Sequence, residues 1–340
     1  MNCYLYGFIE SEVEKNFGPI GFALGNKEKE IVISLPDKNL AAVVGPPPVK
    51  NFGSSNKEQL VRQLLAHQET LETIMKVQFI LPCKFGTLLK DRDEMHKILS
   101  QSRERLEQWF DKIKNCCEMG VIATWDVKQL LQEIAAKDPI ILKLKKDLEK
   151  LSPSELCSHE GEAARITVGA RLSIRLKEEA RRYETAITTK LKNAGEKIVT
   201  HALMNDEMVF NASFLLDRRE EAGFFKLLET LDRDFEGKLN FKCVGPLPPY
   251  SFATVTIQRF ETEKIDWAKE ILMLKDLTTL DQVKKAYQKR ARQCHPDTHS
   301  GFGEKEFETL HQAYEFLKSY HRGGLKPVSV SLFNVNGERR

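Results

Sequence analysis

The chain has 340 residues and a mass of 39.0 kDa, a length at which one hydrophobic core usually divides, so we expect two or three domains. Its 41% hydrophobic and 30% charged residues are typical of a globular protein and exclude a disordered or fibrous one. The net charge of +3 lacks the basic excess of a general nucleic-acid binder, so no nucleic-acid partner is expected.

No export signal is expected, because MNCYLYGFIESEVEK has no basic segment followed by an apolar one. No run of about 18 apolar residues occurs, so no membrane partner is expected. The seven cysteines are scattered and form no CxxC pair, which predicts neither a disulfide framework nor a zinc site. These features favour a cytoplasmic protein. Adjacent Cys116 and Cys117 could form a redox switch, but their place at a strand start favours small apolar packing.

Residues 3–44 predict a run of strands, ended by the rigid Gly45–Pro48 loop. The hydrophobic period then changes to 3.6, which predicts helices around 60–75 and 95–109 with the short strand FILP between them. The segment VIATWDV is expected to close this unit as a strand. Strands interleaved with two helices predict an α+β domain of the ferredoxin-like type over residues 1–126.

Residues 127–260 predict a second α+β domain. Ser152 as N-cap, Pro153 and Glu155 mark a helix start. An apolar stripe from Leu172 to Ile198 predicts a long core-facing helix rather than a coiled coil, because it lacks strict heptads. Two further strands and a helix follow, and SFATVTI is expected to be the last strand of this domain.

Residues 264–322 are helical in pattern and predict a small all-α hairpin, followed by a tail at 323–340. Thr279 is expected to cap a helix that runs to Gln293. One face of that helix is apolar (Val283, Ala286, Tyr287, Ala291 and Cys294), and the opposite face is basic (Lys285, Lys289 and Arg292). The next helix has a second apolar stripe, which we expect to pack on the first (Phe307, Leu310, Ala313, Tyr314 and Leu317).

This region, about residues 265–322, resembles a DnaJ-type J-domain. The tripeptide His295-Pro296-Asp297 has KKAY upstream and AYEFL downstream at the spacing of that family. The resemblance implies that this tripeptide and the basic face (Lys285, Lys289 and Arg292) dock on a DnaK-type chaperone and stimulate its ATP hydrolysis. A basic stripe would steer the encounter with an acidic surface, and proline would stiffen a loop that presents a carboxylate.

Some residues depart from the J-domain pattern. Arg290 stands where the family has a core leucine, Cys294 replaces an aromatic residue, and Met273 replaces the glycine of the first turn. There is little sign of a fourth helix. A J-like hairpin that activates no chaperone is therefore the alternative. A zinc site from Cys294, His295 and His299 lacks a fourth ligand, so no metal is expected.

No catalytic constellation emerges, so neither an enzyme nor a cofactor is predicted. His67 with Glu69 and Glu72 could form an acid/base set, but His67 and Glu69 face different sides of a helix, which favours a surface role. His201 lies near Asp206 and Glu207 without a nucleophile, which favours a loop. No phosphate loop or nucleophile elbow occurs.

Residues of about 3–255 resemble the gas vesicle protein family GvpL/GvpF. The most specific segments are LPCKFGT and GPLPPYSF, and YLYGFIE, HQETLETIM and NASFLLDR occur in the expected order. The resemblance implies two α+β domains, the first a modified ferredoxin-like unit. It also implies an accessory role in building the gas vesicle, contact with the shell protein GvpA and with other accessory gas vesicle proteins, and a place at the vesicle.

Together the two resemblances predict an assembly factor that binds GvpA and recruits a DnaK-type chaperone. An unassembled shell subunit with an apolar surface needs a binding partner, and a strand edge near the N-terminus is one candidate for the contact. The alternative is a minor structural component of the vesicle whose J-like domain does not activate a chaperone.

Overall fold

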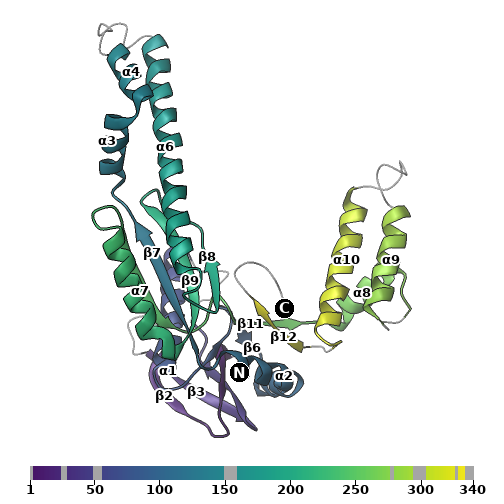
Figure 1. Cartoon of the computed structure of the whole chain (residues 1–340). Helices are drawn as coiled ribbons and strands as arrows, with labels where there is room; N and C mark the ends of the chain where they lie inside the picture. Colours follow the sequence, from purple (N-terminus) through teal and green to yellow (C-terminus); the bar gives the residue numbers. More distant parts are fainter. Residues whose placement is uncertain are drawn as a thin grey trace. The chain divides into compact units, whose positions relative to one another are not determined.

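The computed structural model describes residues 3–23, 29–48, 56–148, 159–275, 279–293, 304–325 and 328–333 (Figure 1). The chain divides into two compact units. The continuous unit spans residues 115–252, and the discontinuous unit joins residues 1–114 to residues 253–340. Both contain helices and antiparallel strands, which confirms the predicted α+β class. Within the described ranges, none of the helices combines the length and the apolar character that a membrane span requires.

The discontinuous unit is built on an antiparallel sheet with the strand order β2-β3-β4-β1-β5, and β6 also pairs with β1. Its strands are β1 (Cys3–Glu10), β2 (Asn16–Ala23), β3 (Lys29–Asp37), β4 (Leu40–Gly45), β5 (Leu81–Pro82) and β6 (Leu88–Leu89). β1 therefore lies inside the sheet, and β2 lies at an edge. Gly7 allows β1 and β5 to approach closely, because a Cβ there would lie 2.5 Å from the Leu81 carbonyl oxygen.

The side chains of β1 alternate between the two faces of this sheet. Tyr4 and Tyr6 contact His67 of helix α1 (Lys57–Met75), whereas Leu5 belongs to the core cluster beneath helix α2 (Arg92–Ile113). A bulge between Leu5 and Gly7 shifts the alternation, and Phe8 joins the α2 side. Both faces of the sheet are thus packed.

Local capping explains where the two helices begin. Asn56 and Gln59 form a complete capping box at the start of α1, and the Asp91 carboxylate accepts from the Glu94 N–H at the start of α2. The buried residues of α2 recur every three or four positions (Met95, Ile98, Leu99, Leu106 and Phe110), which places one face on the core.

The chain returns to the discontinuous unit at β11 (Thr254–Arg259). Three helices follow, α8 (Thr262–Leu272), α9 (Leu280–Gln293) and α10 (Glu304–Arg322), and we call residues 262–322 the J module. Strand β12 (Val328–Phe333) comes next and pairs antiparallel with β11 over its full length. Val330 is completely buried in the core cluster that includes α2. The J module is therefore an insertion between two paired strands.

The continuous unit follows a β-α-β-β-α-β path with the strand order β10-β7-β9-β8, which is the ferredoxin-like topology. Its strands are β7 (Cys116–Thr124), β8 (Lys197–Thr200), β9 (Met208–Asp217) and β10 (Asn240–Leu247). The first crossover contains α3 (Val127–Lys137), α4 (Pro139–Leu148) and α6 (His159–Leu191). The second contains the short helix η2 (Arg218–Glu220) and α7 (Glu221–Asp234).

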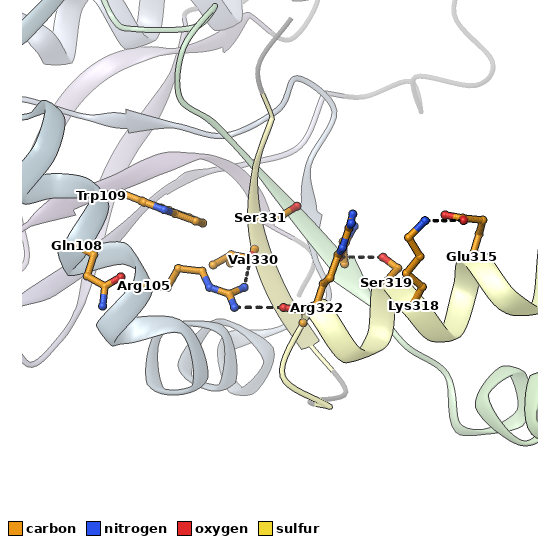
Figure 2. Close-up of a pocket in the computed structure, with 11 residues that line it drawn as sticks. Arg105, Gln108, Trp109, Glu315, Lys318, Ser319, Arg322, Val330 and Ser331 are labelled. Atoms are coloured by element: carbon orange, nitrogen blue, oxygen red, sulfur yellow. Dashed lines mark hydrogen bonds and ion pairs between the residues drawn. The ribbon is translucent and has the colours of Figure 1, made fainter. Parts of the chain in front are cut away.

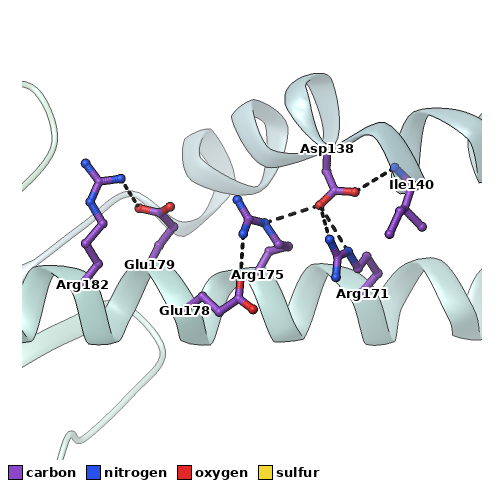
Figure 3. A network of polar contacts seen from close by, with 7 residues as sticks. All are labelled: Asp138, Ile140, Arg171, Arg175, Glu178, Glu179 and Arg182. Carbon is purple, nitrogen blue, oxygen red and sulfur yellow. Dashed lines mark hydrogen bonds and ion pairs between the residues drawn. The ribbon is translucent and has the colours of Figure 1, made fainter.

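The helices of the first crossover are joined by a polar cluster around Asp138 (Figure 3). The buried Asp138 carboxylate caps α4 by accepting from the backbone N–H groups of Ile140 and Ile141. The same carboxylate receives hydrogen bonds from Arg171 of α6, and Arg175 Nε lies 3.4 Å from it. One side chain thus joins the α3–α4 corner to α6.

Some segments differ from the sequence predictions. Of the segment VIATWDV, expected as a strand of the N-terminal unit, residues 121–124 belong to β7, which pairs with β9 and β10 of the continuous unit, whereas Asp126 caps α3. SFATVTI, expected in the second unit, supplies β11 of the discontinuous one. The long helix ends at Leu191, so Ile198 of its predicted stripe lies in β8. Ser152, Pro153 and Glu155 lie outside the described residues.

Candidate functional site

The J module has the predicted helix packing. Its core combines Ile265, Ala268 and Leu272 of α8 with residues of α9 and α10 (Val283, Leu310, Ala313 and Leu317). The ring of Tyr287 stacks on that of Tyr314, with 4.4 Å between their centroids. Thr279 accepts a hydrogen bond from the Gln282 N–H at 3.2 Å and caps α9 as predicted.

The predicted basic face of α9 is exposed. Lys285, Lys289 and Arg292 all have exposed side chains, opposite the buried Val283. Lys285 lies 3.0 Å from Asp281 in an i,i+4 ion pair between exposed groups, an interaction that contributes little to stability. His295, Pro296 and Asp297, together with Cys294 and His299, lie outside the described residues.

Two departures from the J-domain pattern have structural consequences. Arg290 is half-buried, and its Nε is buried without a hydrogen-bond partner among the described residues. Its methylene stem can cover the core edge, but the unpaired N–H destabilises the folded module. Met273 ends α8 with φ at 55°, in the left-handed region that favours glycine. Both residues lower the stability that the J-domain pattern would provide.

A series of polar contacts, most of them between buried side chains, lies within the continuous unit. The Glu118 carboxylate of β7 accepts from the Ser251 N–H at 2.8 Å and from its hydroxyl at 2.7 Å. The Ser251 hydroxyl lies 3.3 Å from that of Ser213 on β9, which lies 2.8 Å from His201 Nε2. The sequence did not single out Glu118, Ser251 or Ser213. Since His201 contacts Ser213 and not the carboxylate, the order of groups is not that of a nucleophile activated by histidine and acid.

His67 occupies a different place from the predicted surface position. Its side chain is buried, and Nδ1 lies 3.0 Å from the Tyr4 hydroxyl. Its ring stacks on Tyr6, with 5.7 Å between centroids. Burial lowers the pKa of His67 to about 4, so the ring is neutral at pH 7. Position 67 lies on the face of α1 that covers the sheet. The helix packing therefore buries this side chain although it is polar.

Cys116 and Cys117 are buried at the start of β7, as the packing interpretation predicts. Burial raises the pKa of Cys116 to about 11 and that of Cys117 to about 12. A thiolate is the reactive form, so these thiols are poorly suited to a redox switch. Among the described residues, no group of three or more histidine, cysteine or acidic side chains is placed to hold a metal ion.

Two apolar features of the discontinuous unit remain open to solvent. Leu60, Val61, Leu64 and Leu65 in the first turns of α1 are each at least 38% exposed. A groove of about 550 Å³ lies beside β3, lined by Ile31, Ile33 and Val44 with Arg92 among its walls. The N-terminal strand β1 offers no free edge here, because it pairs on both sides.

Known proteins match both parts of the chain. A family model described as gas vesicle synthesis protein GvpL/GvpF matches residues 2–254, and a DnaJ domain model matches residues 270–322. Both resemblances found in the sequence are thereby confirmed. β12 lies outside both matched ranges.

Individual relatives agree with the family match. The gas vesicle protein F of Dolichospermum flosaquae is 27% identical over 197 residues, which are 56% of this chain and 77% of the relative. That of Streptomyces sp. strain CB03234 is 24% identical over 256 residues, 74% of this chain and 99% of the relative. The crystal structure of GvpF from Anabaena sp. PCC7120 has a TM-score of 0.58 at 20% identity, covering 75% of this chain and 99% of that one. The last comparison supports the fold.

Proposed function

This chain belongs to the gas vesicle synthesis protein GvpL/GvpF family, and from that premise we propose that it is an accessory assembly protein. It binds unassembled GvpA through its family region and recruits a DnaK-type chaperone through the J module. The observation that carries this proposal is the presence of a gas vesicle region and a DnaJ domain in one polypeptide. We place its work at the gas vesicle.

The packing of the J module supports the chaperone part of the proposal. Tyr287 and Tyr314 hold α9 against α10, and this orientation leaves Lys285 and Lys289 exposed on one side of α9. Such a face can steer the approach of an acidic partner. His295, Pro296 and Asp297 are the further residues that we expect to contact the chaperone.

DnaK ATPase stimulation tests this part. We expect the full-length protein to stimulate hydrolysis and the variant His295→Gln to lose the stimulation, because the tripeptide docks on the chaperone. His159→Gln, the same change at an exposed position in α6, is the matched control and should retain it. Equal stimulation by all three proteins would remove the chaperone from the proposal.

The apolar features of the discontinuous unit support the shell-subunit part. Clustered, exposed aliphatic side chains are typical of a binding site, so each of these two features is a candidate contact for a GvpA subunit with an apolar surface. Leu64 on α1 and Ile31 beside the groove are 40% and 53% exposed. We therefore expect Leu64→Asp or Ile31→Asp to reduce co-purification of GvpA with the full-length chain.

Val77→Asp is the matched control for this experiment, because Val77 is 75% exposed and lies outside both the exposed first turns of α1 and the groove. It should retain GvpA. If all three variants retain GvpA equally, neither surface is the binding site.

The alternative function is a minor structural component with a non-activating J-like domain. The half-buried Arg290 and the left-handed Met273 favour it, since both weaken the module that would activate a chaperone. Retention in washed, purified vesicles distinguishes the two functions. An assembly factor should remain mostly in the soluble fraction, whereas a structural component should remain with the vesicles.

A further inference from the structure

A polar hollow of about 610 Å³ lies where the J module joins the rest of the discontinuous unit (Figure 2). Its walls come from α2, from the last turns of α10, and from the paired strands β11 and β12. We call it the junction pocket. It is not part of the α9 face that would meet a chaperone.

Arg105 of α2 joins the parts that form this pocket. Its guanidinium donates to the Val330 carbonyl of β12 at 2.7 Å and to the Arg322 carbonyl at the end of α10 at 3.2 Å. On the other wall, Ser319 of α10 lies within 3.4 Å of Gln258 of β11. The two hydrogen bonds leave further N–H groups of Arg105 available, because a guanidinium has five.

The charge of the pocket is positive. Arg105, Lys318 and Arg322 line it against a single acid, Glu315, which lies 2.7 Å from Lys318 Nζ. Figure 2 shows the half-buried indole of Trp109 on the α2 side, apart from the Lys318–Glu315 pair on α10. The pocket thus combines cationic groups with an aromatic surface, a combination that suits an anion attached to an apolar group.

The remaining lining favours a peptide over a phosphate. Gln108, Gln258, Ser319 and Ser331 can each donate and accept hydrogen bonds, as an extended peptide backbone requires. A phosphate needs donors alone and would leave the acceptor atoms of these side chains unused. We propose that the junction pocket binds an acidic peptide segment, with carboxylates on Arg105 and Arg322 and an apolar side chain on Trp109.

Such a ligand would contact the J module and α2 at the same time. Because the J module is attached through β11, β12 and the Arg105 hydrogen bonds, an occupied pocket would hold it in one orientation on the unit. This role is independent of DnaK stimulation and of GvpA binding, so each can fail without the others.

Fluorescence anisotropy with the full-length protein tests the proposal. The probe is a fluorescein-labelled peptide of sequence EDLEFDE, and its neutral counterpart is QNLQFNQ. We expect EDLEFDE to bind and QNLQFNQ to bind at least about tenfold more weakly, with a further loss on adding salt. Arg322→Glu should weaken EDLEFDE by about tenfold or more, because it reverses a charge that contacts the ligand.

Lys305→Glu is the matched control, since it makes the same charge change at an exposed position of α10 outside the pocket. It should preserve the affinity, and circular dichroism should confirm that both variants fold. Trp109→Ala gives a second, uncharged test and should weaken EDLEFDE while the charge is unchanged. Equal losses in Arg322→Glu and Lys305→Glu, equal binding of both peptides, or displacement by inorganic phosphate at the concentration of the peptide would overturn the proposal.

Discussion

The two units of this protein are assembled from the chain in different ways. The continuous unit takes all its strands from residues 115–252, whereas the discontinuous unit needs strands from both ends of the chain. Its core joins Leu5 of β1 to Val330 of β12, which are separated by most of the sequence. Local sequence can specify a unit of the first kind, but the second requires pairing between distant segments.

This difference changes how the J module is understood. A module at the end of a chain would be attached to the rest of the protein by a single linker. Here β11 precedes it and β12 follows it, and Arg105 bonds to β12 and to the last residue of α10. A cut at residue 260 would therefore remove Val330 from the core, and we prefer full-length variants for every experiment.

The buried histidine of the discontinuous unit gives the largest expected effect. The pKa of His67 is about 4 in the folded protein, against an ordinary 6.5. Because the folded state keeps the ring neutral, protonation of His67 favours the unfolded state. The free energy of unfolding is therefore undiminished by this group above pH 6.5 and decreases by about 3 kcal/mol in total as the pH falls towards 4. His67→Gln should flatten this pH dependence.

Pulsed hydrogen exchange in urea, at about pH 7 and about pH 5, measures the stability of each unit separately. The control is His201→Gln in the continuous unit, which should leave the pH dependence of α1 as in the wild type. A wild-type pH dependence in His67→Gln would show that the buried ring is not its source.

The second-largest effect is expected for the polar contacts around Glu118 in the continuous unit. Ser251→Ala removes the hydroxyl that donates to the buried Glu118 carboxylate at 2.7 Å, and we expect a loss of about 2–3 kcal/mol. Exchange of β7 and β9 should rise while that of α2 does not change. Ser100→Ala, at an exposed position of α2, should cost less than about 0.5 kcal/mol. Equal effects of the two variants would contradict the role given to Glu118.

Strand β12 should affect only the discontinuous unit. Val330→Ala removes buried methyl groups beside α2 and should destabilise that unit by about 1.5–2 kcal/mol, seen as faster exchange in α2 and β11. Val13→Ala, the same change at a side chain that is 62% exposed, is the control and should have little effect. If exchange in β11 is unaffected by Val330→Ala, β12 does not hold the J module in solution.

The smallest effect is a gain in stability within the J module. Met273→Gly relieves a left-handed residue whose side chain is 71% exposed, so little packing is lost, and the module should gain about 1 kcal/mol. Met204→Gly is the control, because Met204 is 82% exposed and has no positive φ. Gains from both variants, or from neither, would contradict the assignment of strain to Met273.

Helical periodicity predicted the J module well, because its contacts lie between helices close in sequence. The stripe at Val283 and Tyr287 does pack on the one at Leu310 and Tyr314. The tail at 323–340 carries a comparable signal in VSVSLF, whose alternation of apolar and polar residues is typical of a strand. The sequence alone does not show whether these six residues pair with another strand, so it could not distinguish a strand from an unstructured tail. In the structure they pair with β11.

The candidate sites also differ in how far the sequence could predict them. The basic face of α9 follows from spacing alone, because 100° per residue places Lys285 and Lys289 opposite Val283. The Glu118–Ser251 contact and the junction pocket join residues more than a hundred positions apart. Spacing along the chain carries no information about such contacts.

By itself, the sequence determined the family, the J-domain match, the α+β class and the kind of most elements, since these depend on motifs and on periods of two or 3.6 residues. Only the tertiary structure decided that β7 joins β9 and β10, that β11 joins β12, and that His67 is buried. The physical reason is that strand pairing and burial depend on hydrogen-bond partners and neighbours supplied by distant parts of the chain.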